Sequence, residues 1–334
     1  MIQAGAKNRT KSEIDNVIGR GSSDTAAQQH YSELFRKIQS DHKGVKSRIA
    51  NGLFVNKQYH LEENYTQAIA EKYGAMVRSL DFRKLDNAVK EVNDFVKNAT
   101  DGKIKDIVNE QEFKGAQSLI ANAVYFNAHW LWKFYKFYNS MRTFYSYGNS
   151  TRQMSTTSVE FMRHSRTTRM YAEDEDVQVL SLPYLDMSYA FNIILPKQRF
   201  GLRKMIEEVD GKKIQNLLSK VKETFVSVII PKMKVETRCS NLKKMLITMG
   251  VSRVFTGDAE LSGIVKDLPL HISNIAHRAI IEVNENGTMA AAVSLAPLRP
   301  MRLNLNEPKE FLADHPFLFI LTKDKNPLFM GQFA

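Results

Sequence analysis

The chain has 334 residues, of which 43% are hydrophobic and 25% charged, a composition usual for a globular protein of one large domain or two smaller ones. Its longest apolar runs, such as residues 226–230 and 317–321, are far too short to cross a bilayer, so no membrane association is expected. Cys239 is the only cysteine, which excludes an internal disulfide framework and a multi-cysteine zinc site. We expect no metal ion and no other cofactor.

The net charge of +11 raises the question of a polyanionic partner. The basic residues are dispersed, and the densest zone, residues 142–169, mixes arginines with Ser and Thr. No zinc-finger, basic-zipper or aromatic-interleaved RNA motif accompanies them. We therefore expect a solvated basic face and no specific nucleic-acid site, with weak polyanion binding as an alternative.

In chain order, the amino-terminal third is predicted to be helical. Residues 11–18 and 88–99 carry apolar side chains at helical spacing, and Gly102 is a stop signal for the second helix. Further helices are predicted near residues 202–218 and 241–249. Short apolar runs bounded by turn residues predict strands at 119–126, 177–182, 190–195, 226–230, 275–283, 316–321 and 327–333. With no Pro/Gly/Ser-rich linker, the pattern predicts one α+β domain spanning residues 1–334.

No enzymatic motif is present in the sequence. We find no Gly-x-Ser-x-Gly elbow, no His-Glu-x-x-His and no phosphate-binding loop. Gly19-Arg20-Gly21 follows a helix-like segment, whereas a dinucleotide fingerprint follows a strand. Cys239 lies outside any catalytic signature. We predict that the protein is not an enzyme.

The most informative segment follows the predicted strand 279–284. It reads Glu285-Asn286-Gly287-Thr288-Met289-Ala290-Ala291-Ala292, and small side chains recur at every second position from Thr288. Because strand side chains alternate between faces, one face of this segment could enter a packed sheet without a clash. A short helix is the alternative, since Ala favours helices, but Pro297 and Pro300 would interrupt it.

The order Glu-x-Gly-Thr-x-Ala-Ala-Ala resembles the proximal hinge of the serpins, whose inhibitory members insert this loop into their main sheet. The resemblance extends over nearly the whole chain, and its further motifs occur in family order at 93–96, 100–104, 122–126, 129–130, 182–184, 194–196, 230–234, 261–264, 276–279, 313–319 and 327–331. It implies an α+β serpin fold with a large mixed central sheet, packed helices and an exposed reactive-centre loop within residues 285–310.

One departure from the family concerns the amino terminus. Residues 4–10 resemble a segment that family members reach only after two helices and a strand. We therefore expect this serpin domain to be truncated, lacking several dozen residues that cover one face of the core and supply shutter serines. A chain without them is expected to fold poorly by itself.

The resemblance assigns two groups of site residues. The hinge comprises Glu285, Gly287, Thr288, Ala290, Ala291 and Ala292. A sheet-opening network comprises Asn122, Trp130 and His277. Two alternatives stay open: Asn122 and His277 as a satisfied core pair without a switching role, and Trp130 as ordinary packing.

Two counts place the scissile bond differently. Counting forward from Glu285 gives Met301-Arg302, whereas counting backward from Phe311 gives Leu305-Asn306. Cleavage at Arg302-Leu303 would suit a protease with an acidic primary pocket, and Met301 or Leu305 suits an apolar one. We favour Met301, because forward counting measures the part that must insert.

These assignments predict a suicide-substrate inhibitor of a serine protease, with a chymotrypsin- or elastase-like target favoured and a papain-like cysteine protease as the alternative. The rival functions are a non-inhibitory or inactive serpin and a polyanion-binding module. We expect a monomer in the cytoplasm, because no secretory signal begins the sequence and a glycan on the sequon at Asn286 would obstruct insertion. An extracellular location stays open, because the true amino terminus is in question.

Overall fold

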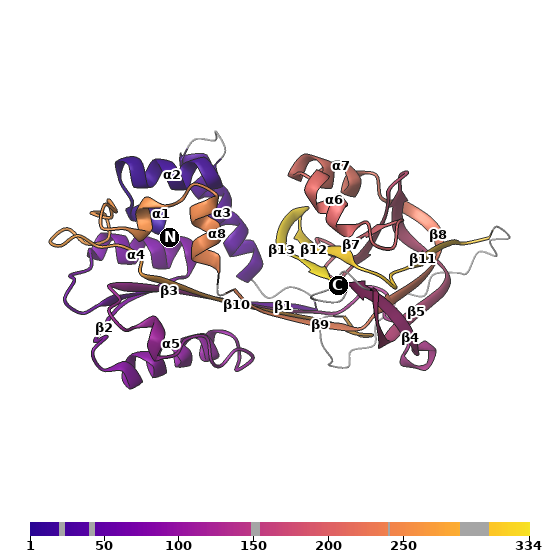
Figure 1. The fold of residues 1–334 in the computed structure, drawn as a ribbon, viewed down its shortest axis with the longest axis horizontal. Coiled ribbons are helices and arrows are strands. Elements are labelled where there is room, and N and C mark those ends of the chain that lie inside the picture. The colour runs from indigo at the N-terminus through magenta and orange to yellow at the C-terminus, as the bar shows by residue number, and fades with distance from the viewer. Residues whose placement is uncertain (20–23, 40–43, 148–153, 240, 288–306) are drawn as a thin grey trace. The chain divides into compact units, whose positions relative to one another are not determined.

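The computed structural model describes residues 1–19, 24–39, 44–147, 154–239, 241–287 and 307–334 (Figure 1). Its contacts group the chain into two compact units, each treated below by itself. The first unit comprises Met1–Asp41, Ser47–Phe126 and Glu236–Ile280, and the second His42–Lys46, Asn127–Val235 and Ile281–Ala334. Whether residues 1–334 behave as one domain stays a prediction.

The first unit combines helices with most of a five-stranded sheet. Its helices are α1 (Ile2–Gly5), α2 (Asn8–Ile18), α3 (Asp24–Gln39), α4 (Glu63–Tyr73), α5 (Leu85–Ala99) and α8 (Leu242–Thr248), with 3-10 turns η1 (Glu110–Glu112) and η3 (Arg253–Phe255). The sheet contains β1 (Val45–Asn56), β2 (Met76–Leu80), β3 (Ser118–Ala128), β9 (Met233–Arg238) and β10 (Asn274–Val283), in the order β2-β1-β3-β10-β9. The strand that leads into the predicted hinge, β10, therefore lies directly beside β3.

The helical prediction for the amino-terminal third is correct for α2 and α5 and wrong for β1 and β2. These two strands pair in parallel, with Gly52 opposite Met76 and Asn56 opposite Leu80. Parallel pairing joins residues far apart in the sequence, so no local signal in either strand specifies it. The glycine stop after α5 is confirmed, since Gly102 has a φ of 72° and its N–H donates to Lys97 O.

The second unit contains an eight-stranded sheet and short helices. The sheet strands are β4 (Ser140–Tyr147), β5 (Met154–Glu173), β6 (Val177–Pro183), β7 (Tyr189–Pro196), β8 (Lys222–Pro231), β11 (Lys309–Leu312), β12 (Phe317–Lys323) and β13 (Asn326–Phe333). Their order is β11-β8-β5-β6-β7-β12-β13, and β4 pairs with β5. The helices are α6 (Leu202–Glu208), α7 (Gly211–Ser219) and the 3-10 turn η2 (Lys136–Tyr138).

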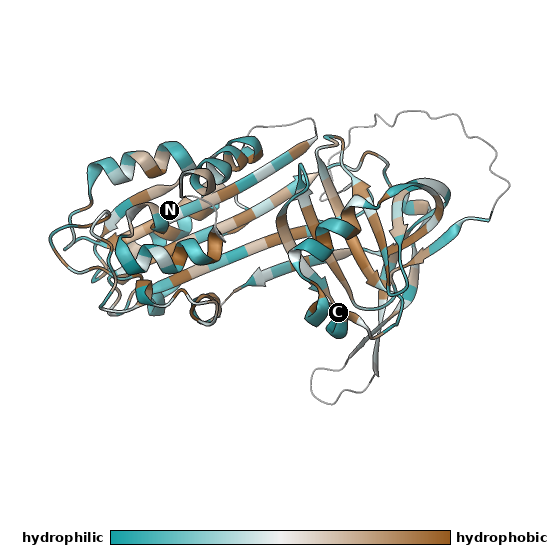
Figure 2. Ribbon diagram, turned by 90° about the horizontal axis from the view of Figure 1, so that it is seen from above, coloured by the Kyte–Doolittle hydropathy of each residue, from teal (hydrophilic) through white to brown (hydrophobic). Residues whose placement is uncertain are grey.

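Apolar strands form the cores of both units. Figure 2 shows brown stretches along the strands, whereas teal residues are frequent on the helices. In the second unit, Val179, Ile194 and Ile320 from three strands are fully buried and pack against Leu202 of α6. The runs predicted as strands in this unit are confirmed as β6, β7, β8, β12 and β13. The single run predicted at 202–218 is two helices, because Asp210 caps α7 by accepting from Lys213 N at 2.7 Å.

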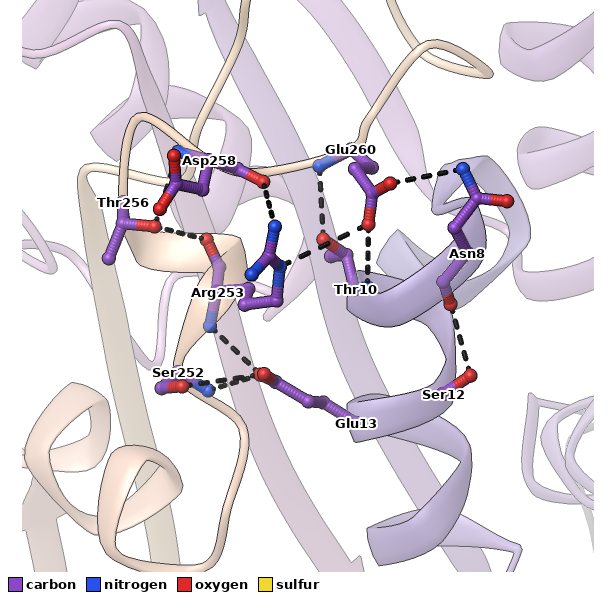
Figure 3. Close-up of polar contacts among 9 residues, drawn as sticks. All are labelled: Asn8, Thr10, Ser12, Glu13, Ser252, Arg253, Thr256, Asp258 and Glu260. Atoms are coloured by element: carbon purple, nitrogen blue, oxygen red, sulfur yellow. Dashed lines mark hydrogen bonds and ion pairs between the residues drawn. The ribbon is translucent and has the colours of Figure 1, made fainter.

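Polar contacts fix helix α2 to the segment 252–260 in the first unit (Figure 3). The Glu13 carboxylate accepts hydrogen bonds from the backbone N–H groups of Ser252 and Arg253 at 2.7 and 2.8 Å, and so caps the start of η3. One turn earlier in α2, Thr10 Oγ1 accepts from Glu260 N at 3.0 Å, and Thr10 N donates to the Glu260 carboxylate at 3.2 Å. The amino-terminal helix is therefore attached to a segment about 240 residues later in the chain.

These contacts set a titration behaviour for Glu13. Burial by itself would raise the pKa of Glu13, but hydrogen bonds from Arg253 and Ser252 outweigh it and lower the pKa below its ordinary value. A carboxyl with a lowered pKa in the folded state contributes stability above its unfolded pKa, and this stability is lost as the pH falls through the folded value.

We predict that Glu13→Ala lowers the free energy of unfolding at pH 7 by about 1–2 kcal/mol, because two buried backbone donors lose their acceptor. Urea unfolding followed by circular dichroism measures the change. The difference from wild type should shrink as the pH falls through the lowered pKa of Glu13, where the wild-type carboxyl itself becomes protonated. Glu175→Ala is the matched control, since Glu175 is exposed and makes no described polar contact. Equal losses in the two variants would contradict the capping interpretation.

Candidate functional site

The predicted hinge begins with a tight turn at the end of β10. Asn284 N donates to Gly287 O at 2.8 Å, and Gly287 N donates back to Asn284 O at 3.2 Å. Gly287 also forms an antiparallel bridge with His129, the residue that follows β3. The start of the loop is thus fixed by backbone hydrogen bonds that depend on no particular side chain.

Glycine is required at position 287. Its φ of 138° is one that L-amino-acid side chains rarely adopt, and a Cβ there would lie 1.9 Å from Ala128 O. The backbone of the hinge therefore touches the backbone at the end of β3. No larger residue fits without displacing one of these two segments.

Trp130 lies beside this turn, as the family resemblance implies. Its side chain is 1% exposed and stacks on Tyr184, with ring centroids 4.5 Å apart. The indole Nε1–H donates to Asn284 O at 2.8 Å, and the backbone N–H donates to Asn286 O at 3.0 Å. Trp130 is both a packing residue and a donor to the hinge, so the two sequence interpretations are compatible.

Glu285 is held by an ionic cluster of four side chains. Its carboxylate lies 3.1 Å from Lys232 Nζ and accepts a hydrogen bond from Asn139 Nδ2 at 2.5 Å. The same two groups also interact with the Glu160 carboxylate. Lys232 Nζ lies 3.0 Å from Glu160 Oε2, and Asn139 Nδ2 donates to Glu160 Oε1 at 2.7 Å. The Glu285 side chain is 12% exposed, so the pair with Lys232 is only partly screened by water.

The sequence analysis missed three members of this cluster. Lys232 belongs to a motif that carried the family resemblance, but nothing local indicated its partner. Asn139 follows η2 and contacts Glu285 from 146 residues earlier in the chain. Glu160 lies in β5 and joins the cluster through Lys232 and Asn139. Only the folded arrangement of β5, β8 and β10 brings these groups together.

Mutual interaction shifts the titration of the cluster. Hydrogen bonds from Asn139 and Lys232 lower the pKa of Glu160. Burial alone would raise the pKa of Glu285. The hydrogen bonds that its carboxylate accepts from its own backbone N–H, from Lys232 and from Asn139 outweigh burial and lower the pKa. Burial would lower the pKa of Lys232, and the two carboxylates raise it. All three groups are therefore charged at neutral pH.

The predicted sheet-opening pair is in direct contact. His277 of β10 lies with Nδ1 2.7 Å from Asn122 Oδ1 of β3, so a hydrogen bond joins the two neighbouring strands. Asn122 Nδ2 donates onward to Asn51 Oδ1 of β1 at 2.6 Å. We expected the polar partners of this pair to come from shutter serines outside the chain, whereas Asn51 supplies one from within it.

The environment keeps His277 neutral. Burial lowers its pKa below the ordinary value, and the contact with Asn122 only partly opposes this effect. A neutral imidazole can donate from one ring nitrogen and accept at the other. Separating the pair would therefore leave no uncompensated charge.

Several predicted site residues lie outside the described residues. They are Thr288, Ala290, Ala291 and Ala292 of the hinge, and Met301, Arg302, Leu303 and Leu305 of the alternative scissile bonds. The structure therefore does not test the position of the reactive bond. Within the described part of the chain, no three His, Cys, Asp or Glu residues are grouped to hold a metal ion, and no helix is long and apolar enough to span a membrane.

Comparison with known proteins decides the family. The family model described as "Serpin (serine protease inhibitor)" matches residues 1–334. The chain is a serpin. It is 31% identical to Antichymotrypsin-2 of Bombyx mori over 328 residues, covering 97% of this chain and 85% of the relative.

Solved serpin structures confirm the predicted α+β serpin fold. Serpin48 of the insect Tenebrio molitor, described as a highly specific serpin, matches with a TM-score of 0.86 and 28% identity, over 99% of this chain and 86% of that one. Human thyroxine-binding globulin, solved with its hormone, also matches with a TM-score of 0.86, over 99% and 87% of the two chains, at 22% identity. That likeness concerns the fold alone, and it shows that one fold serves more than one function.

We predict that Gly287→Ala strongly destabilises the hinge of this serpin. The φ angle alone costs about 1–3 kcal/mol, and the contact with Ala128 O adds to it. Urea unfolding and tryptophan emission, which reports on Trp130 and the nearby Trp132, measure the effect. Gly211→Ala is the control, because a Cβ at Gly211 meets no atom within 4 Å and no positive φ is involved. Equal stability of wild type and Gly287→Ala would contradict the described turn.

We predict that Lys232→Met lowers the free energy of unfolding at pH 7 by about 1–3 kcal/mol, because two neighbouring carboxylates lose their shared cation. The lowered pKa values of Glu160 and Glu285 mean that the wild-type contribution is present above their ordinary value of 4.5 and is lost as the pH falls through the lowered values. The difference between the proteins should therefore narrow in acid.

Stability curves from pH 3 to 8 measure this difference. Lys234→Met is the matched control, since Lys234 is exposed two residues away and makes no described ion pair. A deficit for Lys232→Met that does not depend on pH would show that its aliphatic packing, and not the ionic cluster, carries the effect.

Proposed function

We propose that this serpin inhibits a protease by the insertion mechanism. In that mechanism the protease attacks the exposed loop and forms an acyl-enzyme, after which the cleaved loop enters the main sheet as a new strand. The protease is carried with it and its active site is distorted before deacylation. Serpin loop insertion is an established switching transition.

The observation that carries this proposal is the junction of β3 and β10. The two strands are neighbours in the five-stranded sheet, and β10 leads directly into the hinge at Asn284–Gly287. A strand formed from the residues after Gly287 would therefore enter between β3 and β10. Entry of this strand has to break the hydrogen bond between His277 and Asn122. Both side chains can then form hydrogen bonds with the new strand.

The free-energy balance favours insertion once the loop is cut. Each new ladder hydrogen bond contributes about 0.5–1.5 kcal/mol net, and buried apolar surface adds about 25 cal/mol per Å². The sum over a full strand is comparable with the whole stability of a domain, about 5–15 kcal/mol. The small residues Thr288, Ala290 and Ala292 at alternate positions support this balance, because none of them would overpack the sheet.

We favour Met301 as the residue before the cleaved bond and a chymotrypsin- or elastase-like serine protease as the target. The forward count from Glu285 and the apolar side chain of Met301 support this choice, and Arg302, Leu303 and Leu305 define the competing bonds. The name of the relative Antichymotrypsin-2 is in keeping with an apolar primary pocket. A papain-like cysteine protease is the second candidate target.

We further propose that the protein acts as a monomer in the cytoplasm. The sequon at Asn286 supports this location, because Asn286 O accepts from Trp130 N within the hinge, and a glycan there would obstruct movement of the loop. Immunofluorescence combined with glycosidase treatment tests the location, since a glycosylated, secreted form would contradict it.

Two other functions remain as candidates. A non-inhibitory serpin would use the fold without insertion, as the hormone-bound thyroxine-binding globulin illustrates for the fold. A polyanion-binding module would use the net charge of +11. Both predict that no covalent protease complex forms.

We predict that the protein forms an SDS-resistant complex with chymotrypsin or pancreatic elastase and releases a carboxy-terminal peptide that begins at Arg302. Gel electrophoresis and mass spectrometry of the peptide measure these outcomes, with trypsin and papain in parallel. Thr288→Arg should abolish the complex and leave cleavage intact, because an unpaired charge would have to be buried on the inserting face.

Met289→Arg is the matched control, since strand alternation places position 289 on the opposite face. Its complex should persist. Complete absence of complexes with all four proteases would favour the non-inhibitory alternative, and peptides that begin at Leu303 or Asn306 would reassign the reactive bond.

A further inference from the structure

A cluster of exposed apolar side chains lies in and beside η2. Tyr135, Phe137, Tyr138 and Met141 are 61%, 90%, 57% and 63% exposed, and we call these four residues the aromatic patch. Their rings contact one another edge to face, with centroids 5.5 Å apart for Phe137 and Tyr138 and 6.4 Å for Tyr135 and Tyr138. Exposed groups of large apolar side chains are typical of interaction sites.

The backbone around the aromatic patch is held firmly. Phe134 is buried and stacks on the His164 ring, with centroids 4.3 Å apart. At the other end of η2, Asn139 donates to Glu160 and Glu285. The rings are therefore presented on a fixed turn, so little conformational entropy is lost when a partner covers them.

The surroundings of the aromatic patch are strongly positive. Residues 127–171 contain seven lysines and arginines and a single acidic residue, Glu160, which shares Lys232 with Glu285. Lys136 lies within the patch, and Arg163 and Arg166 are exposed on β5 on either side of His164, whose ring lies 6.5 Å from that of Tyr135. Within the described part of the chain no ion pair joins these three cations to a carboxylate, and Lys136 acts on Glu160 only at longer range, where its charge helps to lower the pKa of that carboxyl. A negatively charged partner is therefore complementary to this surface.

The aromatic patch lies beside the proximal end of the loop and is connected to its distal end through two neighbouring strands. At the proximal end, Phe134 N donates to Glu285 O at 2.9 Å. At the distal end, the loop returns through β11, which pairs with β8, and β8 pairs with the β5 strand that borders the patch. A protease attached to the loop is thus tethered close to this surface, and tethering raises the effective concentration of a second contact.

We propose that the aromatic patch and the cations Lys136, Arg163 and Arg166 form a second docking surface for an acidic region of the protease that attacks the loop. This inference rests on the proposed inhibitory function. According to this proposal, residues outside the loop help to determine which protease the serpin binds. Apolar rings surrounded by cations match the usual anatomy of a protein interface, in which aromatic anchors are ringed by charge.

The test uses chymotrypsin in two forms that differ only in surface charge. Succinylation converts its lysines into carboxylates, and a peptidyl chloromethyl ketone then fills the substrate cleft of each form so that the loop cannot enter. Binding of the full chain to both blocked forms is measured by biolayer interferometry at low and high salt. Because no cleavage is involved, this measurement is independent of whether the serpin inhibits.

We expect the succinylated form to bind at least about tenfold more tightly than the unmodified form at low salt, with the difference lost at high salt as screening predicts. Phe137→Ser combined with Tyr138→Ser, and separately Lys136→Glu, should each weaken binding about tenfold, in keeping with anchor residues. Met187→Ser in the exposed β6–β7 turn and Lys212→Glu on α7 are the matched controls and should change binding less than twofold. Unchanged melting temperatures establish that all variants fold.

The remaining outcomes each overturn the inference. If the patch variants and the control variants weaken binding equally, the net charge of the protein, and not the aromatic patch, accounts for the binding. If the wild-type protein is a dimer and Phe137→Ser converts it to a monomer, the partner of the patch is a second copy of this chain. If an oligo-dT strand binds and the patch variants weaken that binding, the partner is single-stranded nucleic acid. Inhibition of active succinylated and unmodified chymotrypsin at equal rates, unaffected by the patch variants, would leave the proposed function intact and remove the docking surface. If binding depends on the patch but no covalent protease complex forms, the docking surface has no part in inhibition.

Discussion

The backbone contact between Gly287 and the end of β3 is the constraint on which the rest of the site depends. It fixes where the chain leaves β10 of the five-stranded sheet, and it does so with no Cβ between the two segments. Trp130 and the ionic cluster of Glu285, Lys232, Asn139 and Glu160 then hold the same turn from either side. These contacts are noncovalent and involve side chains that can form hydrogen bonds and ion pairs with other partners. The turn is therefore held in place by interactions that can be broken.

The proposed insertion mechanism has two opposing requirements at this junction. Before cleavage, β3 and β10 must stay paired, and the hydrogen bond between His277 and Asn122 contributes to that pairing. After cleavage, the strands must separate at modest cost. A neutral hydrogen-bonded pair meets both conditions better than a buried salt bridge would, since separating a buried ion pair leaves uncompensated charge and costs about 3–5 kcal/mol.

The sequence was sufficient for the elements whose signal is local. The helical spacing from Ala88 to Ala99 and the short apolar strands of the second unit appear where they were predicted. Strands β1 and β2 were missed because their pairing is parallel and nonlocal. The same limit applies to the site: Trp130 and Glu285 were found through a family motif, whereas Asn51, Asn139 and Glu160 were missed because each meets its partner from a distant part of the chain. No periodicity encodes such contacts.

The serpin fold is shared by proteins that are described by different functions. Thyroxine-binding globulin and Serpin48 match this chain with the same TM-score of 0.86, yet one is described by its hormone and the other by its specificity. The functional distinction must therefore reside in particular residues placed on a shared scaffold. In this chain two groups of residues in the second unit are candidates for that distinction: the ionic cluster around Glu285 and the exposed aromatic patch in and beside η2. They are linked through Asn139, because the residue that ends the η2 turn also donates to Glu285. Phe134, at the other end of the same turn, donates its backbone N–H to Glu285 O, so Glu285 is held by groups from both ends of the segment that carries the aromatic patch.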